Sequence, residues 1–314
     1  MTHLIVCDTN YLCHRAFHAI PGLSHQDVPT SVPFGLFSEI ERLHDKFPDG
    51  TFVFCFDRGK PLRMEISSGY KGARRQKRKE ADEEEKEARK SLREQIKRLA
   101  EELLPGAGFK NILFQRGYEA DDLVAAVCLR KNREDRATII AADQDLWQLL
   151  SSKVRIWNPS KKEFLTAKKF QSEWGLEPLQ WTDVKALAGC SSDSVEGVPR
   201  VGEKTAAKFL RGELNPSTKA YEKIVMSTEL WKFNKKLVCL PFDGTTIPEI
   251  LPDEVTKEKW RDIRDQIGMT SLRESFSSPR RNEDICEDPC IDCGKKSWSK
   301  KEMKCLSCGS EIPF

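Results

Sequence analysis

Residues 3–17 read HLIVCDTNYLCHRAF, an apolar run that ends in an acid and passes directly into a helical pattern. The run His3–Asp8 has the length and composition of a buried strand, and residues 10–20 can form a helix. Further apolar runs of strand length lie at 50–57, 111–116, 137–143 and 154–157, separated by helical patterns such as 32–47. This alternation predicts an α/β domain with a parallel sheet that helices cover on both faces.

The pattern becomes helical after about residue 166. Helices are expected at 167–174, 178–189, 203–211, 216–227, 229–239 and 254–267, with turn signals between them. Residues 275–285 have the composition of a linker. We therefore expect an α/β region at 1–165, a helical region at 166–274, and a small terminal module at 286–314.

The charge balance does not select a partner by itself, because 52 Lys and Arg face 49 Asp and Glu among the 314 residues. Only the local distribution of charge along the sequence can indicate the class of partner. No apolar run approaches the length of a membrane span, and the N-terminus lacks the pattern of a signal peptide. We expect a cytoplasmic monomer with reduced thiols and no contact with a membrane.

Acidic residues gather where the predicted strands end. Asp8, Asp57 and Asp143 end three strands, Asp145 follows closely, and Glu119, Asp121 and Asp122 open the helix after a fourth. Each acid alone is most simply a helix N-cap, and capping is slightly favoured for the last three taken alone. However, the carboxyl ends of parallel strands meet in one crevice, and carboxylates that converge there require cations. The full set therefore predicts Mg²⁺ or Mn²⁺ ligands suited to phosphoryl chemistry.

A basic segment follows the second predicted strand. Lys71–Lys79 holds six basic residues in nine and no acid, and a charged helical pattern continues to about Leu104. Ion pairs within a solvated helix explain residues 80–98. They do not explain the basic run, which suits a phosphate backbone. Tyr70 beside it offers either a base-stacking ring or ordinary packing.

A glycine-bearing turn joins two predicted helices within SDSVEGVPRVGEKTAAKFL, residues 192–210. Gly197 and Gly202 let the backbone approach an anion, while amides at the start of the second helix point outward. Lys204 and Thr205 follow the turn. The pattern is typical of a helix-hairpin-helix that binds phosphates, although an ordinary helix–helix turn is the simpler alternative.

Together these motifs resemble the 5′-nuclease (flap endonuclease) family, in particular the bacterial and phage 5′→3′ exonucleases related to the N-terminal part of DNA polymerase I. The resemblance spans about residues 3–270 and rests on DTNYLCHRAF, FDRGKPLR…YKGAR, GYEADD, AADQDL and GCSSDSVEGVPRVGEKTA. It implies a PIN-like nuclease domain with a helical arch at about 70–104. It also implies two-metal hydrolysis of DNA at 5′ flaps, nicks or gaps, and of RNA primers.

The resemblance assigns roles to individual residues. The first metal ion would be held by Asp8, Asp57, Glu119 and Asp121, with Asp122 close by, and the second ion by Asp143, Asp145 and Asp193. Arg63, Lys71 and Arg74 would contact the scissile phosphate region, and Tyr70 would stack. The turn residues Gly197, Val198, Val201 and Gly202 would bind the duplex backbone, with help from a K⁺ ion.

The sequence departs from the family pattern beside the second cluster and in the hairpin. Cys190 stands in place of an aspartate, and Ser194 in place of an asparagine. We expect the second ion to bind more weakly, because a thiol is a poor Mg²⁺ ligand. Arg200 occupies a position that is commonly glycine. The rival hypothesis is a catalytically weakened protein that binds branched DNA.

Five of the 11 cysteines lie after residue 284, four of them in two Cys-x2-Cys pairs: Cys290, Cys293, Cys305 and Cys308. This spacing predicts a zinc ribbon in which the metal supplies the folding energy. Cys286 is a spare thiol. The lysines of the tail suit nucleic acid, and docking to replication proteins is equally compatible with them.

Overall fold

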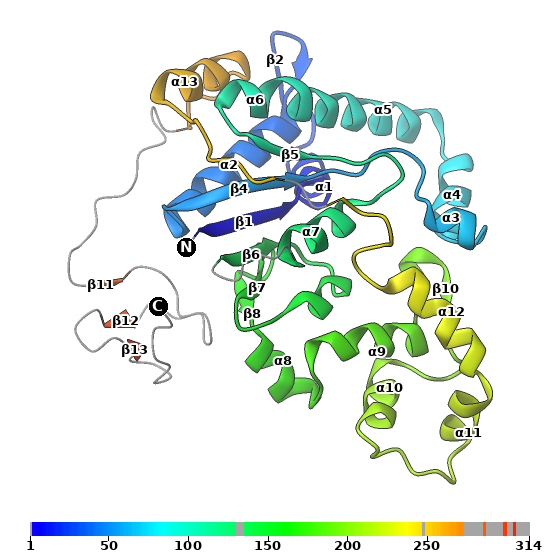
Figure 1. The fold of residues 1–314 in the computed structure, drawn as a ribbon. Coiled ribbons are helices and arrows are strands. Elements are labelled where there is room, and N and C mark those ends of the chain that lie inside the picture. Colours follow the sequence, from blue (N-terminus) through cyan, green and yellow to red (C-terminus); the bar gives the residue numbers. More distant parts are fainter. Residues whose placement is uncertain are drawn as a thin grey trace.

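The computed structural model describes residues 2–129, 135–246 and 249–272, with three two-residue strands nearer the C-terminus. At its centre lies a six-stranded sheet of order β5-β4-β1-β6-β7-β8 (Figure 1). The strands are β1 His3–Asp8, β4 Gly50–Cys55, β5 Asn111–Leu113, β6 Arg136–Ile140, β7 Val154–Asn158 and β8 Glu163–Leu165. The first five pair in parallel, whereas β8 runs antiparallel to β7.

Helices cover both faces of this sheet, as β1 illustrates. Leu4 and Val6 belong to one core, which includes residues of α7 (Ala120–Leu129), α8 (Ala167–Trp174) and α9 (Trp181–Ala188). Ile5 and Cys7 belong to the other core, with α1 (Thr9–Ala19), α2 (Ser31–Lys46) and α13 (Lys257–Gln266). Successive strand residues point to opposite faces, so a strand buried on both sides reads as one continuous apolar run. The predicted α/β fold class is confirmed.

Two short features, a small hairpin and an edge strand, were not predicted from the sequence. β2 (Ser24–His25) and β3 (Val28–Pro29) form a small hairpin, and β8 adds an antiparallel edge strand. Strands of two or three residues contain too few positions to show a period.

The basic and charged segment forms several consecutive helices: α3 Arg63–Ile66, α4 Gly72–Lys79, α5 Glu83–Arg98, the π-helical η1 Leu99–Leu103, and α6 Leu104–Ala107. α4 has no buried residue. α5 instead packs on the domain through Leu92, while Gln95 Oε1 accepts a hydrogen bond of 3.0 Å from the Val32 amide of α2. Within the stretch expected to form an arch, α4 thus contributes no buried residue, whereas α5 is anchored to the domain.

The helical region expected after residue 166 contains α8, η3 (Pro178–Gln180), α9, α10 (Glu203–Leu210), α11 (Lys219–Met226) and α12 (Thr228–Val238). Both α10 and α12 pack on α9, which is drawn below α7 in Figure 1. α13 returns to the α/β core, where the buried Trp260 ring lies 5.3 Å from that of Phe37. The last expected helix is therefore part of the sheet domain's packing.

Nearer the C-terminus, β11 (Ile285–Cys286), β12 (Trp298–Ser299) and β13 (Lys304–Cys305) form an antiparallel sheet. Three of the four expected zinc ligands, Cys290, Cys293 and Cys308, lie outside the described residues, and no side chain is described for Cys305. The zinc ribbon stays a prediction. Among the helices of the described part, none has both the length and the apolar composition that crossing a bilayer demands.

Candidate metal and nucleic-acid site

The acids after the strands meet at one edge of the sheet because β1 lies between β4 and β6 in parallel register. Asp8 ends β1 and caps α1, accepting a hydrogen bond of 3.0 Å from the Tyr11 amide. Asp57, just beyond β4, accepts hydrogen bonds of 2.8 Å from the Asn10 side chain and from the Ala120 amide. Both carboxylates thus have structural hydrogen bonds and also lie at the carboxyl edge of the sheet.

Glu119, Asp121 and Asp122 form a compact group at the start of α7. One oxygen from each lies within 4.8 Å of the others. Glu119 is buried and is contacted by three donors: Lys71 Nζ, the Tyr70 hydroxyl at 2.8 Å, and Arg63 Nη1 at 3.2 Å. Within residues 2–129, 135–246 and 249–272, no ion pair of Asp121 is found. Desolvation, with the Asp122 charge beside it, raises the pKa of Asp121 well above its ordinary value.

Arg63 forms a buried pair with Asp122. Its two terminal nitrogens donate to the two Asp122 oxygens at 2.7 Å each, and Nε donates to the Leu237 carbonyl at 2.8 Å. Arg63 is 2% exposed and Asp122 is 0% exposed. The sequence-based expectation that Arg63 contacts a phosphate therefore needs correction, because a guanidinium with these internal partners does not reach the surface. Asp122 likewise directs both oxygens to protein donors.

A second group gathers Asp145, Cys190 and Asp193, with one ligand atom from each inside a 4.8 Å span. Asp145 is the first residue of the 3-10 helix η2 (Asp145–Leu149), and Cys190 ends β9 (Gly189–Cys190). Lys185 on α9 pairs with Asp145 Oδ1 at 3.2 Å. Asp143 is exposed and outside this group, but it accepts a hydrogen bond of 2.8 Å from the Asp145 amide.

The electrostatics of both groups suit a divalent cation. Desolvation raises the pKa of Asp8 to about 7, and the Asp57 and Asp143 carboxylates act in the same direction. Desolvation and Asp143 likewise raise the pKa of Asp145 to about 6. Among the described residues, none donates a hydrogen bond to the buried Oδ1 of Asp193. Crowded carboxylates with raised pKa values fit hard metal ions, which favour oxygen ligands.

The basic helix α4 begins at these acids. The Lys71 amide donates to the Asp193 carbonyl at 2.7 Å, and the Ala73 amide donates to the Ser194 hydroxyl at 3.1 Å. Arg74 Nη2 lies 3.4 Å from Asp193 Oδ1. Lys71 and Ser194 both adopt positive φ, which lets the two loops approach closely. Hence Lys71 and Arg74 lie at the acidic groups, with the rest of the basic run extending outward.

Tyr70 does not offer a free ring. It is 3% exposed and packs with Ala186, Cys190 and Leu237, while its hydroxyl donates to Glu119. Of the two alternatives from the sequence, packing is the one observed. Base stacking would need an exposed ring face, so that expectation is corrected.

The glycine-bearing turn forms a surface hollow lined by residues 196–202 and Ala188. A Cβ at Gly197 would lie 2.2 Å from the Ala188 carbonyl, so only glycine allows this approach. A Cβ at Gly202 would meet no protein atom, which leaves the start of α10 open to a partner. Val198 and Val201 are buried beneath the turn, Lys204 is exposed and Thr205 is half-buried. Arg200 adopts a left-handed φ of 67°.

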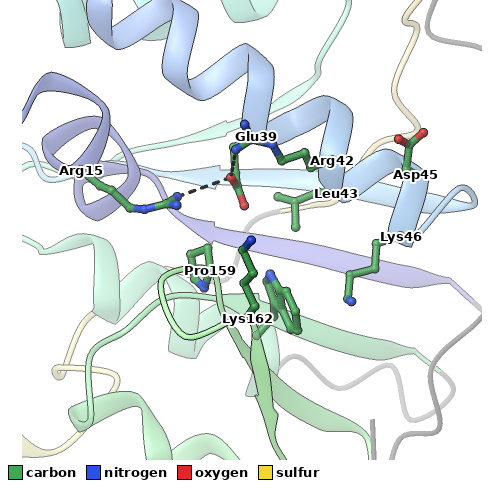
Figure 2. A pocket seen from close by; sticks show the side chains of 9 residues that line it. Arg15, Glu39, Arg42, Leu43, Asp45, Lys46, Pro159 and Lys162 are labelled. Atoms are coloured by element: carbon green, nitrogen blue, oxygen red, sulfur yellow. Dashed lines mark hydrogen bonds and ion pairs between the residues drawn. The ribbon is translucent and has the colours of Figure 1, made fainter. Parts of the chain in front are cut away.

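Another hollow of about 570 Å³ lies between α1, α2 and the turn after β7 (Figure 2). There Arg15 and Arg42 both pair with the buried Glu39 carboxylate, at 3.4 and 3.2 Å. Its lining shares no residue with either acidic group or with the glycine-bearing turn.

Sequence reasoning missed three residues that shape the site. Asn10 bonds to Asp57, Lys185 pairs with Asp145, and the buried Gln148 donates to the Asp145 carbonyl at 2.7 Å. Lys185 left a usable signal, because a lysine among apolar residues of a buried helix requires a partner. Asn10 and Gln148 left none, since an amide looks the same in a sequence whether it is exposed or buried.

Known proteins of similar sequence include a DNA polymerase and an exonuclease. The chain is 31% identical over 209 residues to the thermostable DNA polymerase I of Thermus aquaticus, which covers 66% of this chain and 23% of the polymerase. It is also 27% identical over 212 residues to the 5′-3′ exonuclease of Buchnera aphidicola. That match covers 66% of this chain and 69% of the exonuclease. The chain thus spans about a quarter of the length of its polymerase relative.

Among solved structures, the T5 5′-exonuclease with bound zinc superposes with a TM-score of 0.66 at 26% identity, covering 76% of this chain and 90% of that one. The PIN-like fold implied by the sequence is therefore confirmed. Residues 3–175 match the family described as the 5′-3′ exonuclease, N-terminal resolvase-like domain. Because this match covers more than half of the 314 residues, the chain belongs to that exonuclease family.

Proposed function

We propose that this protein is a metal-dependent 5′ nuclease that cleaves phosphodiester bonds in DNA carrying 5′ flaps, nicks or gaps, and in RNA primers. The observation that carries the proposal is the meeting of two acidic groups at the carboxyl edge of the sheet, at the point where α4 begins. Family membership supports it. So does the fold shared with the T5 flap endonuclease, solved in a pseudo-enzyme-product complex with DNA and metal ions, at 25% identity and a TM-score of 0.65.

In this proposal the carboxylates of Asp8, Asp57, Glu119 and Asp121 hold one Mg²⁺ or Mn²⁺ ion. Asp143, Asp145 and Asp193 serve a second ion that binds more weakly. Such ions stabilise the charge on the attacking and leaving oxygens of a phosphoryl transfer. Arg63 and Asp122 hold Glu119 in position from the protein interior, since both are buried and both form hydrogen bonds with it.

Lys71 and Arg74 complete the proposed reaction site. Lys71 Nζ reaches Glu119 and Asp193, one from each acidic group, so a phosphate lying between these groups would also meet this ammonium. Arg74 is half-exposed beside Asp193 and can contact the same strand. Positive charge held at the reacting phosphate stabilises the transition state more than the ground state.

The remaining contacts would position the duplex. The turn around Gly197 and Gly202, with Lys204 and Thr205, is proposed to bind the phosphate backbone, with a K⁺ ion bridging turn and phosphate. The cysteine pairs of the tail are proposed to hold one Zn²⁺ and to present a module to DNA or to replication proteins. We expect the protein to act as a monomer.

A labelled 5′-flap duplex, incubated with purified protein and Mg²⁺ or Mn²⁺, tests the proposal. We expect cleavage with either ion and none in a chelator. Asp57→Asn and Asp121→Asn should reduce the single-turnover rate by at least about 100-fold, because replacing even the residues that hydrogen-bond to metal ligands costs about 10–100-fold. Flap binding should largely survive. Asp45→Asn, an acid in the hollow of Figure 2, is the matched control and should cleave normally.

Cleavage by Asp57→Asn or Asp121→Asn near the wild-type rate would contradict the metal assignment. Tight flap binding without cleavage in any ion would instead favour the rival hypothesis of a DNA-binding protein with a weakened active site.

A further inference from the structure

Cys190 is the only non-carboxylate ligand candidate in the two acidic groups found among the described residues. It is 7% exposed, and its sulfur lies 3.8 Å from Asp145 Oδ2 and 3.0 Å from the Ser192 hydroxyl. The side chain therefore points into the second group and away from solvent. Packing against Tyr70 and Leu237 holds the Cys190 sulfur beside the two carboxylates.

The spacing allows sulfur and oxygen to share one ion. Zn–O bonds of about 2.1 Å and Zn–S bonds of about 2.3 Å together span about 4.4 Å, which exceeds the 3.8 Å between Cys190 Sγ and Asp145 Oδ2. The Asp193 carboxylate supplies the third donor; its Oδ1 accepts no hydrogen bond within the described residues, although Arg74 and Lys71 form ion pairs with it at 3.4 and 3.8 Å. All three ligand atoms lie within 4.8 Å of one another, so small movements of the side chains would bring them to one ion.

The donor set is poor for Mg²⁺. Magnesium takes six oxygen ligands in near-ideal octahedral geometry, whereas Lys185 already engages Asp145 Oδ1 at 3.2 Å. Cys190, Asp145 and Asp193 together match a four-coordinate ion of borderline or soft character, with the fourth position left for the neighbouring Asp143 carboxylate of the proposed second site.

We propose that Cys190 binds the second ion directly through sulfur, and that the second group thereby selects Zn²⁺, Co²⁺ or Cd²⁺ over Mg²⁺. The inference rests on the proposed function only in that this group binds a metal. On binding, the Cys190 thiol releases its proton to solvent and a metal–sulfur bond forms, with no change of oxidation state. The second group is thus a mixed oxygen–sulfur site in a chain whose first group is built from carboxylates alone.

The test titrates Cd²⁺ into full-length protein kept reduced with a phosphine, and records the ultraviolet absorption of the cadmium–thiolate bond. Wild type is compared with Cys190→Ser and Cys190→Asp. The tail cysteines are identical in all three proteins, so their signal cancels in the difference spectra. We expect one additional thiolate band in the wild type, and Cd²⁺ affinity at this site lowered at least about tenfold in Cys190→Ser.

The complementary arm follows the Mg²⁺ dependence of flap cleavage. Cys190→Asp restores an oxygen donor, so its Mg²⁺ midpoint should fall at least about tenfold while the cadmium–thiolate difference band disappears. Identical spectra for wild type and Cys190→Ser would overturn the sulfur ligand, even if cleavage is normal. If no variant cleaves in any ion, the proposed function fails, but a difference band would still support Cys190 as a ligand.

Discussion

Replacing Arg63 by methionine should destabilise the protein more than it changes contact with DNA. Arg63 donates to both Asp122 oxygens at 2.7 Å and to the Leu237 carbonyl at 2.8 Å. Methionine fills similar space but leaves a carboxylate that is 0% exposed without its cation. Breaking a buried pair in this way costs about 3–5 kcal/mol. That is a large share of the roughly 5–15 kcal/mol that stabilises an ordinary domain.

The assay is urea unfolding in metal-free buffer, followed by circular dichroism. The matched control is Arg15→Met, because Arg15 also pairs with a buried acid, Glu39, but is 35% exposed. Glu39 keeps Arg42 as a second partner, so this change should cost less than about 1 kcal/mol.

A double variant separates charge from packing. Arg63→Met/Asp122→Asn removes the unpaired charge and should recover part of the lost stability. Recovery will be incomplete, because the Asp122 oxygens accept from the Glu119 amide at 3.1 Å and from the Phe242 amide at 2.8 Å, and asparagine keeps only one acceptor oxygen for the two. If Arg63→Met unfolds within about 1 kcal/mol of wild type and only weakens DNA binding, Arg63 contacts phosphate and our account of the pair is wrong.

Three further outcomes are expected. Because the pKa of Asp8 is raised to about 7, chiefly by desolvation, the folded metal-free protein binds its proton more tightly than the unfolded chain does. Through this group, stability should therefore fall as pH rises from about 4 to 7, by up to about 4 kcal/mol. Asp8→Asn, which keeps the helix cap, should remove this share of the dependence in urea unfolding and leave the share of Asp121 and Asp145. Lys71→Ala should slow single-turnover cleavage far more than it weakens duplex binding; a variant with a normal rate and poorer affinity would refute this role. Protein truncated after Ser278 should lose one zinc per chain by elemental analysis, and zinc retained after truncation would exclude the cysteine pairs as its ligands.

The sequence alone determined the sheet and the location of its acids. A strand buried on both faces must be apolar throughout, so β1, β4 and β6 are visible as runs, and an acid directly after such a run lies at the edge of the sheet. Local patterns also located the glycine turn and the basic helix α4, since both depend on residues that are neighbours in the chain. Cys190 and Asp193, in contrast, were assigned to the second group only through the resemblance to the 5′-nuclease family.

Tertiary structure alone decided what the long side chains do. Arg63 looks in the sequence like one more cation of a basic segment, but its partners lie 59 and 174 residues away, at Asp122 and Leu237. Tyr70 is buried for the same reason, through Glu119, 49 residues distant. The sequence records a residue's type and its neighbours, whereas burial depends on which remote segments pack over it. A cation that folding covers must pair with an acid inside the protein, while one left exposed, such as Arg74, can contact DNA.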